Sequence, residues 1–240
     1  MTSVGESDST PAWWLDEVAN AGRENLDADH VSHYDSKEDA GAGDEVQLCQ
    51  QFGVNGASVV VDLGVGTGQF ALAVAPVCAR VIAVDVSPVM LETLRAKIAH
   101  AQVPNIEVVQ AGFLTYDHEG DAPDFVYSRY GLHHLPDFWK AVALTRIHQM
   151  LRPGGLFRLW DVVYNFDPIE TRERIEDWCS SGTTTSPDSW SRDELEEHVR
   201  DEQSTFSWLL EPMMQRAGFA IDVAEYSDDG IFAKYVLRCL

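Results

Sequence analysis

The sequence predicts an α/β protein built on a doubly wound, mostly parallel sheet. Short apolar runs alternate with helix-like patterns over residues 57–164, glycines follow the first run, and a Pro-Gly-Gly turn precedes the last. Strands that alternate with helices pair in parallel and carry helices on both faces. We expect five such strands and a C-terminal antiparallel hairpin, which gives a seven-stranded sheet with a small helical cap.

The predicted elements follow from local patterns. The run Ser58–Leu63 is continuously apolar, as a strand buried on both faces should be. Ser87 and Pro88 favour the start of a helix, as N-cap and first residue. Asp137 is expected to cap a later helix, with Phe138 on its inner face. The expected order is strand 58–63, helix 67–78, strand 81–84, helix from 88, strand 106–109, strand 124–127, helix from 138, strand 156–163, a helical insert in 165–203, helix 205–217, and strands 220–226 and 231–237.

Composition excludes several classes of protein. The formal net charge is −22 with no offsetting Lys/Arg stripe, so we expect no nucleic-acid partner, because phosphate neutralisation supplies most of that affinity. No apolar run reaches the ~18–20 residues that span a bilayer, and the polar start does not resemble a signal peptide. We therefore expect a cytoplasmic protein with no membrane partner. Four scattered cysteines predict neither structural zinc nor a disulfide framework.

The strongest motif is Asp62-Leu63-Gly64-Val65-Gly66-Thr67-Gly68, where the first strand turns into a helix. Glycines permit tight turning and close approach of a ligand, and a helix N-terminus offers free N–H groups. The carboxylate of Asp62 would repel a pyrophosphate but suits the amino group of an amino-acid moiety, directly or through water. Asp85, at the end of the second strand, can accept hydrogen bonds from both ribose hydroxyls of a nucleoside. Either motif alone would also fit a generic turn or a helix cap.

Four blocks together resemble the class I S-adenosylmethionine-dependent methyltransferases, especially the small-molecule branch of ubiquinone-biosynthesis-type and methyltransferase type 11-like enzymes. The blocks read VVVDLGVGTG (59–68), VDVSPVM (84–90), SRYGLHHLPD (128–137) and LRPGG (151–155). The resemblance implies a Rossmann-like fold and S-adenosyl-L-methionine as the cofactor. It divides the chain into a lid segment, 1–44, and a methyltransferase domain, 45–240, with a cap insert at 165–203.

The resemblance also implies a set of cofactor contacts. Asp85 would hold the ribose, and Gly64 and Gly66 would pass under the methionine part. Phe113 stands where the family often has an acidic residue for the adenine amino group, so stacking or a backbone contact is expected there. The expected cofactor-binding residues are Asp62, Gly64, Gly66, Gly68, Asp85, Val86, Met90, Gly112, Phe113, Ser128 and Arg129.

Candidate catalytic residues are His133, His134 and Tyr34. The two histidines follow the fourth strand, at the sheet edge where ligands bind, and an imidazole there could take a proton from a substrate near neutral pH. Helix capping and core packing are the alternative. No metal is expected, because the end of the fourth strand lacks the Asp of metal-dependent catechol-type enzymes.

The lid and the insert carry many aromatic residues, which could bind an acceptor and exclude water. We expect residues 30–34 to cover the cofactor, with Tyr34 near the reacting methyl. The predicted function is methyl transfer to a small molecule by in-line displacement, without a metal. A non-catalytic S-adenosylmethionine-binding protein and a nicotinamide-dependent oxidoreductase remain alternatives. The aromatic residues concerned are Trp13, Trp14, Tyr34, Trp178, Trp190 and Trp208.

Overall fold

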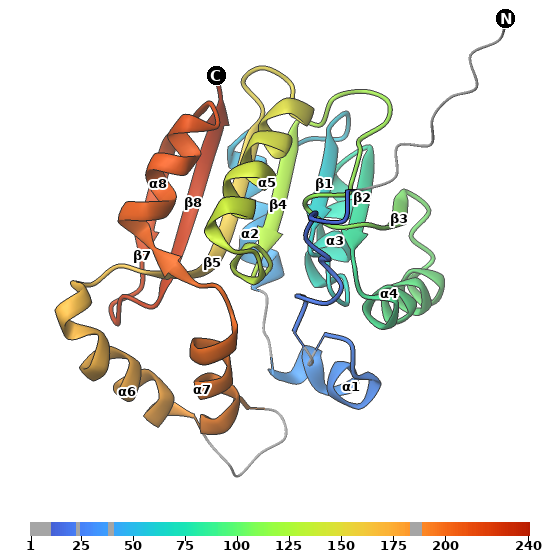
Figure 1. Ribbon diagram of the computed structural model, residues 1–240. Coiled ribbons are helices and arrows are strands. Elements are labelled where there is room, and N and C mark those ends of the chain that lie inside the picture. The colour runs from blue at the N-terminus through green and yellow to red at the C-terminus, as the bar shows by residue number, and fades with distance from the viewer. Residues whose placement is uncertain (1–10, 23–24, 38–40, 183–188) are drawn as a thin grey trace, which may run out of the picture.

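The computed structural model describes residues 11–22, 25–37, 41–182 and 189–240, and Figure 1 shows a twisted sheet with helices on both faces. The strands are β1 (Val59–Leu63), β2 (Arg80–Asp85), β3 (Ile106–Gln110), β4 (Phe125–Arg129), β5 (Leu156–Tyr164), β6 (Thr205–Phe206), β7 (Phe219–Tyr226) and β8 (Phe232–Cys239). The helices are α1 (Ala28–Lys37), α2 (Ala42–Gln51), α3 (Gln69–Val74), α4 (Pro88–Ala101), α5 (Asp137–Met150), α6 (Thr171–Ser181), α7 (Arg192–Asp201) and α8 (Ser207–Arg216), with short 3-10 helices at Ala75–Val77, Leu132–His134 and Pro168–Glu170.

The sheet confirms the predicted fold class. Its strand order is β3-β2-β1-β4-β5-β8-β7; the first five strands are parallel, and β8 runs antiparallel to both β5 and β7. The sheet has eight strands rather than the expected seven, because Thr205 and Phe206 pair with the end of β5 before α8 begins. Residues 205 and 206 were expected to be helical.

Alternation along the central strands separates two cores. Val60, Val81 and Tyr127 pack towards α2, α3 and α4, whereas Val61, Ile82 and Val126 pack towards α5 and α8. All four cysteines are buried free thiols. In the described parts of the chain, no helix combines the length and the apolar character that spanning a membrane requires.

Three local expectations have different outcomes. The Ser87 hydroxyl accepts a hydrogen bond from the Met90 N–H, so the predicted N-cap of α4 is confirmed. The predicted Asp137 cap is wrong: α5 begins at Asp137 itself, and the carboxylate instead receives hydrogen bonds from Lys140 and Thr205. Phe138 was expected inside but is 67% exposed.

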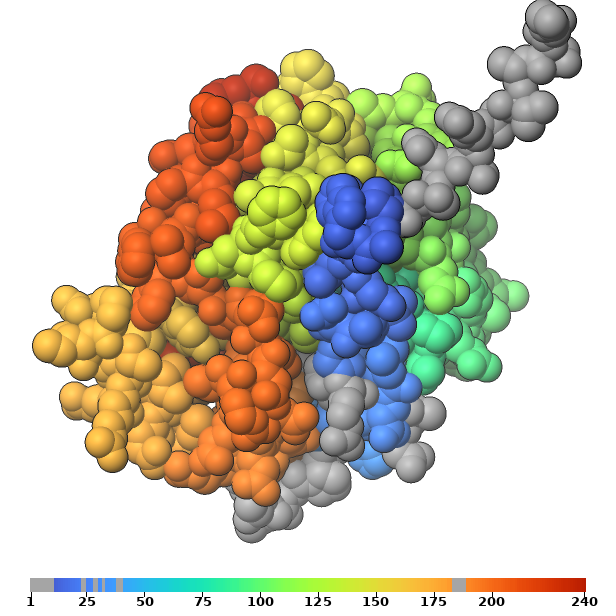
Figure 2. Space-filling view, in the orientation of Figure 1, coloured from blue at the N-terminus to red at the C-terminus, as the bar shows by residue number. Residues whose placement is uncertain are grey.

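Helix α1 and the cap insert cover the end of the sheet at which the parallel strands terminate. In Figure 1, α1, α6 and α7 lie together below that end. Figure 2 shows the N-terminal segment in blue and α7 in orange next to each other over this part of the molecule. The arrangement places two sequence-distant segments over the carboxyl ends of the strands, where open α/β sheets bind ligands.

Candidate active site

The glycine-rich turn is held against β2 by backbone hydrogen bonds. The N–H groups of Gly64 and Val65 donate to the carbonyl of Val84, at 2.9 and 3.0 Å, and Gly66 N–H donates to Oδ2 of Asp85 at 2.8 Å. Gly64 and Gly66 have φ values of +74° and +53°, in the left-handed region where a side chain is strained. The turn therefore needs glycine to bring its backbone beside Asp85.

Two carboxyl groups lie under this turn. Oδ1 of Asp85 accepts a hydrogen bond from Ser87 N–H at 2.8 Å, and burial raises the pKa of Asp85 above its usual range. Asp62 is 2% exposed, and burial together with the charge of Asp85 raises its pKa well above the usual range. Each oxygen of Asp85 accepts one backbone hydrogen bond and retains acceptor capacity for a ligand hydroxyl.

A cavity of about 70 Å³ opens beside Asp85 and the turn. The structure brings seven of the expected cofactor-binding residues together in its wall. They are Gly64, Gly66, Asp85, Val86, Gly112, Phe113 and Arg129. Glycine backbone, an aromatic ring and a buried carboxylate are a suitable lining for an adenosyl group with an amino-acid tail.

Four expected residues lie outside this wall. Asp62 and Ser128 are buried inside the strands behind it, and Met90 is in the core of α4. A Cβ on Gly68 would lie 2.2 Å from Leu94 Cδ1, so this glycine allows close packing of the turn on α4. Their assignment as cofactor contacts stays a prediction.

The N-terminal segment supplies cavity residues that no sequence motif indicates. Glu17 is 7% exposed, accepts hydrogen bonds of 3.1 Å from Leu114 N–H and Thr115 Oγ1, and lies against Gly112. Burial raises the pKa of this carboxyl. Asn20, Ala21 and Asn25 complete this side of the wall.

A larger cavity of about 360 Å³ adjoins the first and lies under the cap. Asn25, Tyr34, Tyr130 and His134 line both cavities, so they form the boundary between them. Its other lining residues are Asp27, His30, His133, Val162, Trp178, Trp190, Glu194, Leu195, Glu197, His198, Glu202 and Phe232. Trp178 and Trp190 were singled out in the sequence.

The other three tryptophans that the sequence singled out lie outside both cavities. Trp13 and Trp14 pack on Trp139, with ring centroids 6.3 and 4.9 Å from its ring, and Trp208 is 56% exposed. None of these three lines either cavity. These three residues pack against a helix or face solvent, so they give no support to a role in acceptor binding.

Two adjacent histidines occupy opposite electrostatic environments. Burial alone would lower the pKa of His133, but the flanking carboxylates of Asp161 and Glu202 outweigh it and raise that pKa to about 10. Burial, reinforced by the charge of His133, lowers the pKa of His134 to about 3. Asp161 is 1% exposed and its Oδ1 lies 2.5 Å from His133 Nδ1, so it makes a buried hydrogen bond that orients this imidazole.

Tyr130 adopts an unusual backbone conformation between the cavities. Its φ is +52°, and its N–H donates to the carbonyl of Trp160 at 2.9 Å. The guanidinium of Arg129 lies 4.4 Å from the Tyr130 ring centre and 4.6 Å from that of Trp160. Strained residues of this kind are frequent at functional sites, and Arg129 and Trp160 hold this one in place.

Tyr34 reaches the site because α1 is anchored at two places. Asp35 contacts the hydroxyl of Thr67 and the ammonium of Lys97, and accepts a hydrogen bond of 3.2 Å from Gln69 Nε2. Lys37 forms an ion pair of 2.7 Å with Glu194 of α7. The helix is thus tied to both the glycine-rich turn and the cap, and Tyr34 Cε1 lies 3.8 Å from the position of a Cβ on Gly66.

Comparison with known proteins supports the predicted family of this fold. Residues 60–155 match the family described as a methyltransferase domain. The match spans the glycine-rich turn, Asp85 and the end of β4. These residues form a class I S-adenosylmethionine-dependent methyltransferase domain. This domain supplies Gly64, Gly66 and Asp85 to the wall of the smaller cavity, and that lining fits S-adenosylmethionine, the cofactor of the family.

Two curated relatives of the methyltransferase domain have names that specify different small-molecule substrates. A demethylmenaquinone methyltransferase of Lactococcus lactis is 34% identical over 100 residues, which are 40% of this chain and 38% of that protein. A trans-aconitate 2-methyltransferase of Methylobacterium radiotolerans is 32% identical over 125 residues, 51% of this chain and 45% of that protein. The chain spans about half the length, or less, of these curated relatives.

Solved structures share the fold of the methyltransferase domain at low sequence identity. An S-adenosylmethionine-dependent methyltransferase from Aquifex aeolicus has a TM-score of 0.59 at 15% identity, covering 90% of this chain and 100% of that one. One from Mesorhizobium loti has a TM-score of 0.57 at 20% identity, covering 80% of this chain and 96% of that one.

Proposed function

We propose that the protein transfers the methyl group of S-adenosylmethionine to a small-molecule acceptor bound in the larger cavity. The observation that carries this proposal is the shared boundary of the two cavities. Asn25, Tyr34, Tyr130 and His134 line both of them, so a cofactor in one and an acceptor in the other meet at these four side chains. At about 360 Å³ the larger cavity is within the usual range for small-molecule sites.

The chain's own residues orient and enclose the reactants. When bound, S-adenosylmethionine would supply a methyl group on a positively charged sulfur, and an acceptor atom that attacks this methyl in line would displace S-adenosylhomocysteine. Asp85 accepts hydrogen bonds from ribose hydroxyls, and Tyr34 and the cap exclude water from the boundary. Alignment and desolvation account for most of the rate because the sulfonium is already activated.

Adenine recognition is proposed to use the N-terminal segment. Phe113 lies in the cofactor wall and can stack on the base, and Glu17 places a carboxylate next to Gly112. A carboxylate can accept a hydrogen bond from the exocyclic amino group of adenine. Glu17 would therefore replace the acidic residue that Phe113 displaces from the end of the third strand.

Binding and turnover experiments test the proposal separately. Calorimetry should show binding of S-adenosylmethionine and S-adenosylhomocysteine but not of NAD or NADP. A library of small acceptors, incubated with a methyl-labelled donor, should yield a labelled product. Nicotinamide binding without binding of the sulfonium compound would overturn the proposal. Cofactor binding with no labelled product from the library would favour the non-catalytic alternative.

One substitution can block the acceptor cavity alone. Val162 lines the larger cavity and not the smaller one. Val162→Phe should abolish turnover of the identified acceptor while S-adenosylhomocysteine still binds with wild-type affinity. Ile169→Phe, at a residue that is 89% exposed and outside both cavities, is the matched control and should turn over normally. Full turnover in Val162→Phe would show that the acceptor binds elsewhere.

A further inference from the structure

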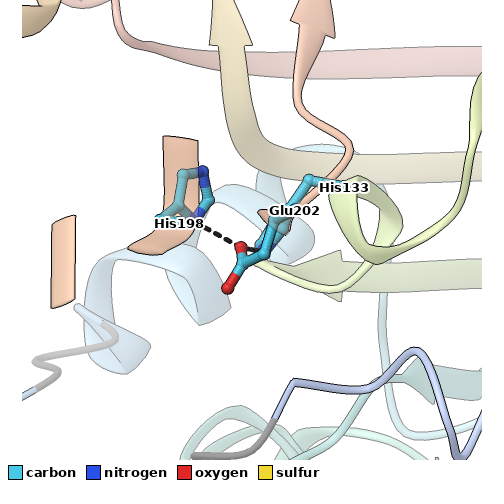
Figure 3. Close-up of side chains that lie close together, drawn as sticks. All are labelled: His133, His198 and Glu202. Atoms are coloured by element: carbon cyan, nitrogen blue, oxygen red, sulfur yellow. Dashed lines mark ion pairs between the residues drawn. The ribbon is translucent and has the colours of Figure 1, made fainter. Parts of the chain in front are cut away.

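Three metal-ligand side chains meet in the larger cavity. His133 comes from the 3-10 helix after β4, His198 from α7, and Glu202 directly follows α7. Their ligand atoms all lie within 4.8 Å of one another. Figure 3 shows both imidazoles directed at the Glu202 carboxylate, and Glu202 Oε2 is 2.9 Å from His133 Nε2 and also contacts His198 Nδ1.

The far nitrogen of each imidazole already has a partner. His133 Nδ1 lies 2.5 Å from Oδ1 of Asp161, whose second oxygen accepts the His133 backbone N–H at 3.1 Å. His198 Nε2 lies 2.9 Å from the hydroxyl of Ser204. Such outer partners fix the orientation of metal-binding histidines, and a bound ion would replace the proton on the nitrogen that faces Glu202. Here the two remaining nitrogens face the same carboxylate oxygen.

The contacts within the cluster are close but poorly aligned. Glu202 Oε2 is buried, and among the described residues it accepts no hydrogen bond of acceptable geometry, although both imidazoles contact it. A buried carboxylate oxygen normally has aligned donors. Two imidazole nitrogens and a carboxylate oxygen that meet in a buried place without aligned hydrogen bonds suit a shared cation.

We propose that His133, His198 and Glu202 bind one divalent transition-metal ion in the acceptor cavity. Two imidazoles and one carboxylate suit zinc, iron and related ions, and three protein ligands leave coordination positions open. Magnesium is disfavoured because it requires oxygen ligands. The expectation of no metal rested on sequence motifs, and it could not take account of His198 and Glu202, which reach His133 from the cap.

The position of the cluster indicates a role for the ion. The open coordination positions would face the cavity that His133, His198 and Glu202 line. The ion would bind an acceptor that carries an oxygen ligand, such as a carboxylate or an enol or phenol oxygen, and this part of the inference rests on the proposed function. Metal binding itself does not depend on it.

Cobalt(II) provides a direct test in the full-length protein. The protein is stripped with a chelator, and Co²⁺ is then added without cofactor or acceptor. We expect one Co²⁺ per chain with visible ligand-field absorption, displacement by Zn²⁺, and no competition from excess Mg²⁺. Absence of the absorption band and of stoichiometric Zn²⁺ binding by calorimetry would overturn the proposal and leave the cluster as a proton-linked ion network. Failure to find an acceptor would leave this result unaffected.

Variants assign the ion to the three side chains. Glu202→Gln and His198→Phe should each weaken Co²⁺ binding more than ~100-fold, and Asp161→Asn should weaken it by about 10–100-fold through the orientation of His133. The phenyl ring of His198→Phe retains packing against Trp178, whose ring centre is 5.3 Å from that of His198.

His100→Phe, at an exposed histidine of α4, is the matched control and should bind as the wild type does. Wild-type affinity in Glu202→Gln and His198→Phe would place the ion elsewhere and refute the assignment.

Discussion

Oδ2 of Asp85 accepts a hydrogen bond of 2.8 Å from the backbone N–H of Gly66. This contact joins the end of β2 to the glycine-rich turn after β1. The other oxygen, Oδ1, accepts the Ser87 N–H, so the carboxylate cannot rotate away when the cavity is empty. On the prediction that Asp85 binds the ribose, its carboxylate is already oriented by the backbone, and little ordering cost would remain for binding.

Replacing Asp85 should weaken cofactor binding more than folding. Asp85→Ala removes a charge-assisted pair of ribose hydrogen bonds and should cost about 2–3 kcal/mol of S-adenosylhomocysteine affinity. Calorimetry measures the loss. Asp117→Ala, at an exposed carboxylate outside both cavities, is the control. If Asp85→Ala folds and binds as tightly as the wild type, Asp85 is not the ribose ligand.

Cofactor affinity should fall as the pH is lowered. Burial raises the pKa of Asp85 in the folded, cofactor-free protein. Above this raised pKa the carboxylate accepts hydrogen bonds from ribose; below it, one oxygen carries a proton and the charge is lost. Affinity should therefore decline at a pH above the usual titration range of an aspartate. The same titration of Asp85→Ala should be flatter, and parallel profiles for the two proteins would contradict the explanation.

Two glycines with positive φ, Gly68 in the glycine-rich turn and Gly53 after α2, should differ strongly in how well they tolerate alanine. Gly68 has a φ of +86°, and a Cβ there would lie 2.2 Å from the buried Leu94 side chain. Gly53 has a φ of +99° but no atom within 4 Å of a Cβ. Gly53→Ala should cost about 1–2 kcal/mol of unfolding free energy from backbone strain, and Gly68→Ala a further ~1–3 kcal/mol from overpacking. Denaturant unfolding that gives equal losses would show that Leu94 relaxes freely.

The parts of the fold that local sequence encodes could be predicted. The apolar run of β1, the Ser87-Pro88 helix start and the Asp-Asp-Gly turn between β7 and β8 each act within a few residues. The two-residue β6 is too short to have a periodicity, so it was missed. Phe138 and Trp139 are adjacent aromatic residues on one helix, and the way this helix packs on the sheet buries Trp139 in the core and leaves Phe138 exposed.

The site was predictable only where the domain's own motifs form it. Gly64, Gly66 and Asp85 belong to consecutive strand ends, which a parallel sheet brings together. Glu17 reaches Leu114 across 97 residues, and nothing in the surrounding sequence indicates that contact. His198 and Glu202 likewise read as the polar face of a charged helix. Long-range packing creates these contacts, and a single sequence shows no pattern for it.

A buried ion pair between α2 and β5 should show strong coupling. Glu45 and Arg158 are 5% and 3% exposed, and both nitrogen-to-oxygen distances of their bidentate contact are 2.8 Å. Removal of one partner leaves an unpaired buried charge, so Glu45→Gln or Arg158→Met should each cost about 3–5 kcal/mol of unfolding free energy. The double variant should lose less than the sum. Additive losses in chemical denaturation would indicate that water already solvates the pair.

The last prediction concerns α1 as a lid over the cofactor. Asp35 and Lys37 tie this helix to the glycine-rich turn and to α7, and Tyr34 lies between the two cavities. A segment that admits substrate and then excludes water should open locally when the site is empty and gain order when it is filled. Residues 30–34 should therefore exchange amide hydrogens more slowly once S-adenosylhomocysteine binds.

Two variants separate the lid from the rest of the fold. Deleting residues 1–40 should leave a folded sheet but abolish turnover and weaken cofactor retention, because Glu17, Asn25 and Tyr34 are lost from the cavity walls. Asp35→Asn loosens α1 from Lys97 without removing any lining residue, and it should speed exchange at residues 30–34 in the empty protein. Ligand-independent exchange there, together with normal turnover by the truncated protein, would show that acceptor binding and water exclusion depend on α6 and α7 instead.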